Sequence, residues 1–267
     1  MKENNFKINN NHLKTAISDV KPNEIYTRGY NQKELIENFS FSEMIFLLLQ
    51  GKLPSTQEEK LFNRILVSFC DHGTTPPSTQ TARVISSAGS SINNAVAGGL
   101  LSFGKNHAGA IENAMNLYQK SINTLKLTGS AEIDNGQIVQ LAINIFNDYE
   151  KDKFKIPGFG HRYHDKDPRA SKLLDLAIEE GLIGHHTKLA LTLQNILKEH
   201  KKIELNVDGA NAALLSDMGF APNLGFGIFI IGRVPGLVAH SYEESIEEEE
   251  FRKFCNLDDI IYKGKRR

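Results

Sequence analysis

The sequence predicts an all-α fold. Apolar residues recur at the three-and-four spacing of a helix through most of the 267 residues. One short stretch, residues 202–207, has the pattern of a strand, and no internal repeat or low-complexity linker divides the chain. Such a chain is expected to bury its core by packing helix against helix.

The first expected helices have recognisable ends. A helix over 42–51 has Ser40 or Ser42 to cap its start and Gly51 to cap its end. A second helix is expected over 56–70, where one face carries Leu61, Phe62, Ile65, Leu66 and Phe69. Both segments have the amphipathic pattern of helices that bury one side.

Small residues mark the middle of the chain. Pro76-Pro77 interrupts the helical pattern before a helix expected over 78–87. Glycine and alanine crowd residues 88–104 and predict a buried central helix, because small side chains let neighbouring helices approach closely. Further helical patterns cover 108–127, 137–149, 170–180 and 187–200.

Composition indicates a soluble cytoplasmic protein. The net charge is −1, so no basic surface argues for a nucleic-acid partner. Cys70 and Cys255 lie far apart without metal-ligand spacing, which fits a reducing compartment. The polar N-terminus is unlike a secretory signal, and no apolar run approaches the roughly 20 residues of a membrane span. We therefore expect no membrane partner.

Residues 156–169 combine glycines, histidines and arginines in one short segment. Its sequence is Ile-Pro-Gly-Phe-Gly-His-Arg-Tyr-His-Asp-Lys-Asp-Pro-Arg. The glycines let backbone N–H groups approach a ligand. His161 can hold or give a proton near neutral pH, and Arg169 can bind a carboxylate through two hydrogen bonds. This combination indicates an enzyme that acts on a small acid together with a phosphate-bearing partner.

Pro157-Gly-Phe-Gly-His161 and Asp167-Pro-Arg169 resemble the signature of the citrate synthase superfamily. Further blocks resemble it in the same order across about residues 25–260. They are Arg28-Gly-Tyr30, Ser40-Phe-Ser-Glu43 with Leu47-Leu-Leu-Gln-Gly-Lys-Leu-Pro54, Asp71-His72-Gly73, His107-Ala-Gly-Ala-Ile-Glu112, Asn206-Val-Asp208-Gly209, and Gly232-Arg233-Val-Pro-Gly-Leu-Val-Ala-His240.

The resemblance implies three catalytic residues. Asp208 would be the general base at the methyl carbon of acetyl-CoA, although its position also suits the N-cap of a helix from Ala210. His107 would donate a hydrogen bond to the thioester carbonyl as charge develops there, although a histidine before a helix is often only a cap. His161 would exchange a proton with the oxygen of oxaloacetate, and its neighbour His164 has no matching role.

The resemblance also implies a set of substrate cations. Arg169 and Arg233 would hold carboxylates, although isolated arginines more often form surface ion pairs. His72 is a third donor, although Asp71-His-Gly could simply end a helix. Arg252 is the best match to an arginine that, in this family, reaches in from the second subunit.

CoA is implied as a thioester substrate, with no tightly bound cofactor. The backbone of Gly158, Phe159 and Gly160 would meet the adenine, and Arg162 a phosphate. The sequence lacks the Gly-x-x-x-x-Gly-Lys-Ser/Thr motif, so the chain is not expected to activate citrate with ATP. No metal site is expected, because the histidines lack ligand spacing along the chain.

The implied architecture is a two-lobed helical fold in a homodimer. Residues 1–108 and 223–267 would form the large lobe, and 109–222 a small lobe inserted between them. The active site would lie between the lobes, and their closure would exclude water. The helix at 88–104 would contribute to the dimer interface.

The chain is shorter than ordinary citrate synthases, and its length and the wording Leu205-Asn-Val-Asp-Gly209 resemble citryl-CoA lyase and the citrate-synthase-like module of ATP-citrate lyase. The leading hypothesis is cleavage of citryl-CoA to acetyl-CoA and oxaloacetate, with a separate citryl-CoA synthetase as supplier. His107 is also present in citrate synthases, so a short citrate or 2-methylcitrate synthase (an acyltransferase releasing citrate) stays an alternative. A citramalate-type substrate and a non-catalytic CoA-binding subunit are more remote ones.

Overall fold

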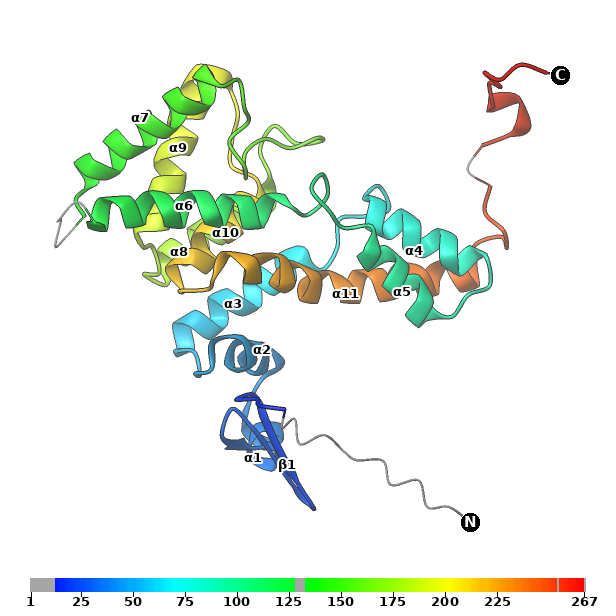
Figure 1. Cartoon of the computed structure of the whole chain (residues 1–267), viewed down its shortest axis with the longest axis horizontal. Helices are drawn as coiled ribbons and strands as arrows, with labels where there is room; N and C mark the ends of the chain where they lie inside the picture. The colour runs from blue at the N-terminus through cyan, green and yellow to red at the C-terminus, as the bar shows by residue number, and fades with distance from the viewer. Residues whose placement is uncertain (1–12, 128–132, 254, 267) are drawn as a thin grey trace, which may run out of the picture. The chain divides into compact units, whose positions relative to one another are not determined.

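A computed structural model describes residues 13–127, 133–253 and 255–266 and confirms the all-α prediction. Eleven α-helices and a small three-stranded sheet lie within the described residues (Figure 1). The chain divides into two compact units, residues 1–59 and residues 60–267. The lobes expected at 1–108, 109–222 and 223–267 stay a prediction.

The first unit contains the sheet. Strands β1 (Ser18–Lys21), β2 (Glu24–Thr27) and β3 (Tyr30–Asn31) pair antiparallel in that order and are followed by α1 (Gln32–Asn38) and α2 (Phe41–Gln50). These strands have no clear pattern in the sequence, because each spans only two to four residues and most of their side chains are exposed. The caps expected for α2 are present, at Ser40 and at the left-handed Gly51.

Helix α3 (Thr56–Phe69) begins in the first unit and ends in the second. The second unit also contains α4 (Pro77–Ser87), α5 (Ile92–Leu101), α6 (Ala110–Leu127), α7 (Asn135–Lys151), α8 (Pro168–Glu179), α9 (His185–Lys201), α10 (Val207–Asp217) and α11 (Pro222–Glu247). Helix α10 is buried over most of its length and contacts α6, α8 and α9. Helices α4 and α5 pack along the C-terminal half of α11 (Figure 1).

The strand expected at 202–207 is wrong. Only an isolated bridge pairs Leu205 with Phe159, and α10 already begins at Val207. Asn206 is the N-cap, and its side chain accepts a hydrogen bond from the N–H of Gly209. The apolar pair Leu205 and Val207 is buried because it anchors the start of a helix, a burial that a strand would also produce. Asp208 therefore lies in the first turn of α10 and is not its cap.

The buried helix expected at 88–104 is only partly buried. Helix α5 buries Ala95 and Gly99. The close approach is real, because a Cβ added to Gly99 would lie 2.9 Å from the carbonyl oxygen of Ser78 on α4. The opposite face of α5 is exposed, and Leu101 is 86% accessible. The small residues thus serve the packing of α4 on one side of α5.

Helix α11 is long and apolar enough, by length and composition, to cross a membrane. The sequence analysis found no such run because Arg233, Pro235 and His240 interrupt its apolar residues. In the structure 44% of the apolar window is buried inside the molecule, and α11 packs against α4, α5 and α6. Because the core helix of a soluble protein passes the same test, α11 is weak evidence for a membrane span.

Candidate active site

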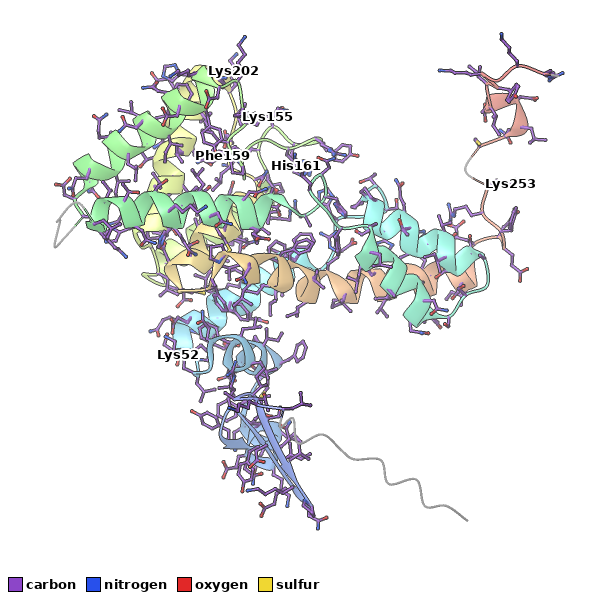
Figure 2. All side chains as sticks on the ribbon, in the orientation of Figure 1. Lys52, Lys155, Phe159, His161, Lys202 and Lys253 are labelled. Carbon is purple, nitrogen blue, oxygen red and sulfur yellow. The ribbon has the colours of Figure 1, made fainter. Side chains whose placement is uncertain are left out.

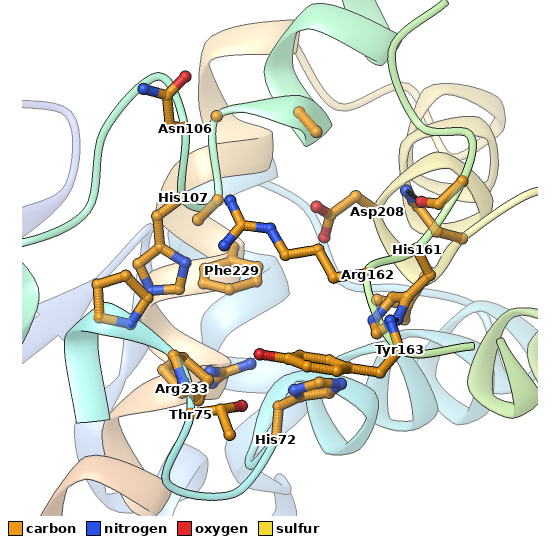
Figure 3. A pocket seen from close by; sticks show the side chains of 18 of the residues that line it. His72, Thr75, Asn106, His107, His161, Arg162, Tyr163, Asp208, Phe229 and Arg233 are labelled. Atoms are coloured by element: carbon orange, nitrogen blue, oxygen red, sulfur yellow. Dashed lines mark hydrogen bonds between the residues drawn. The ribbon is translucent and has the colours of Figure 1, made fainter. Parts of the chain in front are cut away.

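A pocket of about 290 Å³ in the second unit collects most of the predicted site residues. Its walls include the three predicted catalytic side chains, His107, His161 and Asp208. Figure 3 shows Asp208 pointing into the pocket between the two histidines, with His72 and Arg233 on the opposite wall. The further lining residues are Thr75, Pro76, Pro77, Lys105, Asn106, Ala108, Gly109, Ala110, Gly160, Arg162, Tyr163, Arg169, Asn206, Val207 and Phe229.

The loop between α7 and α8, which carries Phe159 and His161 (Figure 2), is fixed against the start of α10. The N–H of Asn206 donates to the carbonyl of Gly158 over 3.0 Å, and its side-chain amide donates to the carbonyl of Gly160 over 2.7 Å. A Cβ on Gly209 would lie 2.2 Å from the oxygen of Gly158. Glycine is therefore required where the loop meets the helix that carries Asp208.

Two glycines one helical turn apart bring α11 against the end of α3. A Cβ on Gly232 would lie 2.7 Å from the Cβ of Phe69, and one on Gly236 would lie 2.0 Å from the carbonyl oxygen of Cys70. This approach lets Arg233 donate from Nε to the carbonyl of Phe69 over 2.6 Å. The side chain of Arg233 is buried yet reaches the pocket.

The turn after α3 that carries His72 is held by Asp71. One oxygen of Asp71 accepts the N–H of Gly73 at 3.1 Å, and the other lies 2.9 Å from Nε2 of His240 on α11. Burial, followed by the nearby Arg169, lowers the pKa of His72. His72 therefore faces the pocket as a neutral imidazole at pH 7.

His107 is neutral and oriented by the start of α4. Its Nε2 lies 2.8 Å from the hydroxyl of Ser78 and 3.4 Å from the N–H of the same residue. Because an N–H can only donate, Nε2 is an acceptor and Nδ1 carries the proton. Burial, with Arg233 and Arg162 nearby, lowers the pKa of His107 to about 4. The ring is thus neutral, and its one proton, on Nδ1, is available for a hydrogen bond.

His161 is oriented by its own loop. Its Nδ1 accepts the N–H of Tyr163 at 3.1 Å, so in the neutral ring Nε2 carries the proton. Burial lowers the pKa of His161, although Asp167 opposes the shift. The resting state of His161 is therefore a neutral donor at Nε2.

Asp208 has the features of a general base. Burial raises the pKa of Asp208 to about 6, although Arg169 and Arg233 oppose the shift. Within the described residues no protein group donates a hydrogen bond to its carboxylate. Its place in the first turn of α10 favours the ionised form through the helix dipole. A carboxylate with a pKa close to the working pH can both take and return a proton.

Arg169 lines the pocket but is already paired. Its Nε and one terminal nitrogen donate to the two oxygens of Asp167 at 3.0 and 2.9 Å. Asp167 also accepts the N–H of Val207 at 3.0 Å, so the pair ties α8 to the start of α10. Burial would raise the pKa of Asp167, but the hydrogen bonds and the charge of Arg169, together with the hydrogen bond from Val207, outweigh it and lower the pKa. The remaining N–H groups of Arg169 are left for a substrate carboxylate.

The structure does not bring Arg252 to the pocket of its own chain. Its guanidinium pairs with the buried Glu244 at 2.5 and 2.7 Å and with Glu248 at 3.0 Å. Glu244 also binds Nε of the buried Arg83 at 2.6 Å, and these groups fasten the segment after α11 to α4. A role of Arg252 in a second subunit stays a prediction.

The residues predicted to bind CoA are only partly in the pocket. Gly160 and Arg162 line it, while Gly158 and Phe159 lie beside it. The N–H of Gly160 is taken by the carbonyl of Glu204 at 2.9 Å and is not free for adenine. Phe159 faces Leu205 as the non-hydrogen-bonded pair of an antiparallel bridge, so its N–H and C=O point away from that partner. The backbone N–H and C=O of Phe159 therefore take no part in the hydrogen bonds of this bridge and are available to a ligand.

Several site residues were missed by the sequence analysis. Ser78 supports His107, Asp167 holds Arg169, and Phe229 packs under the guanidinium of Arg233 at 5.1 Å. Phe229 stands one helical turn before Arg233 on α11, a spacing that places the two side chains on the same face of the helix. Ser78 follows the diproline of an expected helix start but lies 29 positions from His107, so no local pattern could pair them.

Three histidines meet at the rim of the pocket. One ring nitrogen from each of His72, His161 and His164 lies within 4.8 Å of the corresponding nitrogens of the other two. The sequence predicted no metal site, because the first of these residues lies far from the other two along the chain. The fold brings them together by placing the turn after α3 against the α7–α8 loop.

The comparisons with known proteins agree on one family. The chain matches the family described as "Citrate synthase, C-terminal domain" over residues 9–63 and 55–254. It is 31% identical to citrate synthase of Heyndrickxia coagulans, over 86% of this chain and 58% of the relative. It is 33% identical to citrate/2-methylcitrate synthase of Bacillus subtilis, over 84% of this chain and 59% of the relative. The chain thus spans less than three fifths of these curated relatives.

Solved structures extend the likeness. Citryl-CoA lyase from Hydrogenobacter thermophilus superposes with a TM-score of 0.84 and 40% identity, over 96% of both chains. ATP citrate lyase of Methanosaeta concilii, in complex with (3S)-citryl-CoA, has a TM-score of 0.77 and 21% identity. That match covers 95% of this chain and 42% of the other, and at this identity it shows the fold alone.

Proposed function

The chain belongs to the citrate synthase family, and we propose that it breaks or makes the carbon–carbon bond between acetyl-CoA and oxaloacetate through citryl-CoA. The leading activity is that of a citryl-CoA lyase. The observation that carries this proposal is the pocket that joins a neutral donor, His107, a second donor, His161, and a carboxylate with a raised pKa, Asp208. The likeness to citryl-CoA lyase over 96% of both chains supports cleavage as the direction of the reaction.

In condensation, Asp208 takes a proton from the methyl carbon of acetyl-CoA. The resulting enolate oxygen accepts a hydrogen bond from Nδ1 of His107, whose ring is neutral at the working pH because its pKa is lowered to about 4. The enolate carbon attacks the ketone of oxaloacetate, and His161 gives the Nε2 proton to the ketone oxygen. Cleavage runs the same steps backward: Nε2 of His161 takes back the hydroxyl proton of citryl-CoA, the C–C bond breaks to give oxaloacetate and the enolate of acetyl-CoA, and a protonated Asp208 then returns its proton to the enolate carbon.

The cations of the pocket bind the acid substrate. Arg233 is buried, and among the described residues its one hydrogen bond, from Nε, goes to a backbone carbonyl, so its terminal nitrogens are left for a carboxylate. Arg169 contributes the N–H groups that Asp167 does not use. His72 adds a neutral donor beside them. These groups suit a dicarboxylate or tricarboxylate held next to His161.

CoA enters as a thioester substrate, and no tightly bound cofactor is proposed. The open backbone groups of Phe159 suit the edge of an adenine, and Arg162 at the pocket wall suits a phosphate. No Walker-type loop is present, so citryl-CoA would come from a separate synthetase. The proposed location is the cytoplasm.

The proposed assembly is a homodimer of two-lobed subunits, with lobe boundaries at 1–108, 109–222 and 223–267. Apolar side chains exposed on two packed helices support an interface there. They are Ile92 and Leu101 on α5 and Val238, Tyr242 and Ile246 on α11. In the dimer, Arg252 would leave its carboxylate partners and reach the substrate of the other subunit.

The alternative is a short citrate or 2-methylcitrate synthase, favoured by the names of the curated relatives. Two assays separate the activities. Citryl-CoA is supplied and oxaloacetate is measured; then acetyl-CoA and oxaloacetate are supplied and free thiol is measured. Oxaloacetate from citryl-CoA with little thiol release supports the lyase. Fast thiol release with citrate as the product supports the synthase, and activity in neither assay contradicts both.

A further inference from the structure

We propose that His72, His161 and His164 form a binding site for a borderline divalent transition-metal ion of the Zn²⁺ class, and that the bound ion shuts the substrate end of the pocket. The three rings come from two segments, the turn after α3 and the α7–α8 loop. Within the described residues they are the one group of three or more metal-type side chains close enough to share an ion.

The geometry is near to that of a metal site. The ligand nitrogens all lie within 4.8 Å of one another. Three imidazoles around Zn²⁺, with Zn–N bonds of about 2.0–2.1 Å in a tetrahedron, have nitrogens roughly 3.4 Å apart. The two spacings differ by at most about 1.4 Å, which rotation of the side chains supplies. His164 is exposed and free to make this adjustment.

The ring nitrogens are available. Within the described part of the chain neither His72 nor His164 forms a hydrogen bond through its ring, and each instead lies against another histidine ring. The ring centroids of His161 and His164 are 4.5 Å apart, and those of His72 and His161 are 5.2 Å apart. His161 accepts one hydrogen bond, from the N–H of Tyr163, and metal binding exchanges this contact for a metal–nitrogen bond.

The ligand set selects the ion. Three imidazoles without a carboxylate suit Zn²⁺, Cu²⁺, Ni²⁺ or Co²⁺, whereas Mg²⁺ and Ca²⁺ require oxygen ligands. The nearby arginines oppose a cation, but the charge of Arg169 is matched by its two hydrogen bonds to Asp167. Arg233 remains as a repulsive charge, so the site is expected to bind reversibly. The fourth position is left to water or to an oxygen of a small carboxylate.

The expected inhibition by the metal ion rests on the proposed function, whereas binding of the ion does not. His161 is the proposed proton donor and His72 a proposed substrate donor, so an ion held by both removes them from catalysis. His164 has no part in the reaction as proposed. It therefore provides a variant that separates metal binding from turnover.

The test is a Co²⁺ titration of tag-free protein that has been freed of metal with a chelator. Tetrahedral Co²⁺ absorbs visible light strongly, so binding is read without substrate. The wild type should bind a single Co²⁺ saturably and release it to Zn²⁺. His164→Asn should bind it about tenfold more weakly or worse. His200→Asn, at another exposed histidine that stacks on Phe146 at the end of α9, should titrate as the wild type does.

Activity supplies the second readout. Metal-free His164→Asn should turn over substrate as the wild type does, and Zn²⁺ should inhibit the wild type but not this variant at the same concentration. The absence of saturable Co²⁺ binding in the wild type overturns the proposal, as do equal titrations of the wild type and His164→Asn. If the protein has no activity, the titration alone still decides the metal site.

Discussion

The hydroxyl oxygen of Ser78 lies 2.8 Å from Nε2 of His107, which joins the first turn of α4 to the residue proposed to hold the enolate. Ser78 is buried and its own N–H points at the same nitrogen over 3.4 Å. Because both contacts occupy Nε2, they set the tautomer that exposes the Nδ1 proton to the pocket. The role proposed for His107 therefore depends on the contact with Ser78.

Replacing this serine should lower turnover. Ser78→Ala removes a hydrogen bond worth about 1 kcal/mol, which corresponds to about a fivefold loss in kcat with little change in KM for either substrate. Steady-state kinetics measures both. Ser86→Ala is the matched control, because it lies on the same helix, is buried and does not line the pocket. Equal kinetics in the two variants would show that Ser78 does not orient His107.

The raised pKa of Asp208 predicts opposite pH dependences for the two directions. Condensation needs the carboxylate, so its kcat/KM should fall as the pH drops below about 6. Cleavage needs the protonated form, so its kcat/KM should fall as the pH rises above about 6. The measurement is kcat/KM against pH with acetyl-CoA and with citryl-CoA, and thermal melts over the same range confirm that the protein stays folded. Parallel profiles for the two directions would contradict the assigned role.

The contact between Gly158 and Gly209 should not accept a methyl group. Gly209→Ala places a Cβ 2.2 Å from the oxygen of Gly158, and such overpacking costs about 1–3 kcal/mol of the free energy of unfolding. Because the strain falls between His161 and Asp208, kcat should drop as well. Gly227→Ala on α11 is the control, since its Cβ meets nothing within 4 Å. Denaturant unfolding measures the free energy of unfolding, and steady-state kinetics measures kcat. Wild-type values of both for Gly209→Ala would refute the close approach.

Asp217 at the end of α10 caps the start of α9 and should stabilise the protein above acidic pH. Its carboxylate accepts the N–H groups of Gly184, His186 and Thr187 at 3.0 Å each. Burial would raise the pKa of Asp217, but the hydrogen bonds from His186 and Thr187 outweigh it, so the pKa is lowered. A group with a lowered pKa stabilises the fold above its unfolded value of about 3.9 and loses this contribution as the pH falls through the folded value.

Asp217→Asn should therefore lower the free energy of unfolding by about 2 kcal/mol at pH 7. The difference from the wild type should shrink as the pH falls below about 4. Urea unfolding at several pH values measures it, with Asp175→Asn on the exposed face of α8 as the control. A difference that is independent of pH would show that the charge of Asp217 is not involved.

The sequence predicted those features of the fold and the site that depend on residues close together along the chain. Helical spacing, the caps at Ser40 and Gly51 and the motif blocks predicted the helices and most of the pocket residues. It failed where two patterns look alike: the buried Leu205 and Val207 suit a strand and a helix start equally. It also failed where partners are far apart, as for Ser78 with His107 and for His72 with His164, because only the fold makes them neighbours.

Arg252 shows a further limit of the sequence. The family resemblance suggested that Arg252 contacts the substrate of a second subunit, whereas in the single chain the buried Glu244 and the nearby Glu248 pair with its charge. No spacing rule distinguishes an arginine that serves its own chain from one that serves another. The carboxylates that compete for it lie four and eight residues earlier, Glu248 within the run Glu247–Glu250 and Glu244 in the pair before that run, and nothing in the sequence marks them as partners of Arg252.

The central claim is that Asp208 moves the proton at the carbon that becomes the methyl group of acetyl-CoA. The most direct measurement is citryl-CoA cleavage by Asp208→Asn, with CoA binding followed by calorimetry on the same preparation. The amide can neither take nor return the proton, so we predict no measurable turnover together with nearly unchanged CoA affinity. Wild-type turnover by Asp208→Asn would contradict the mechanism.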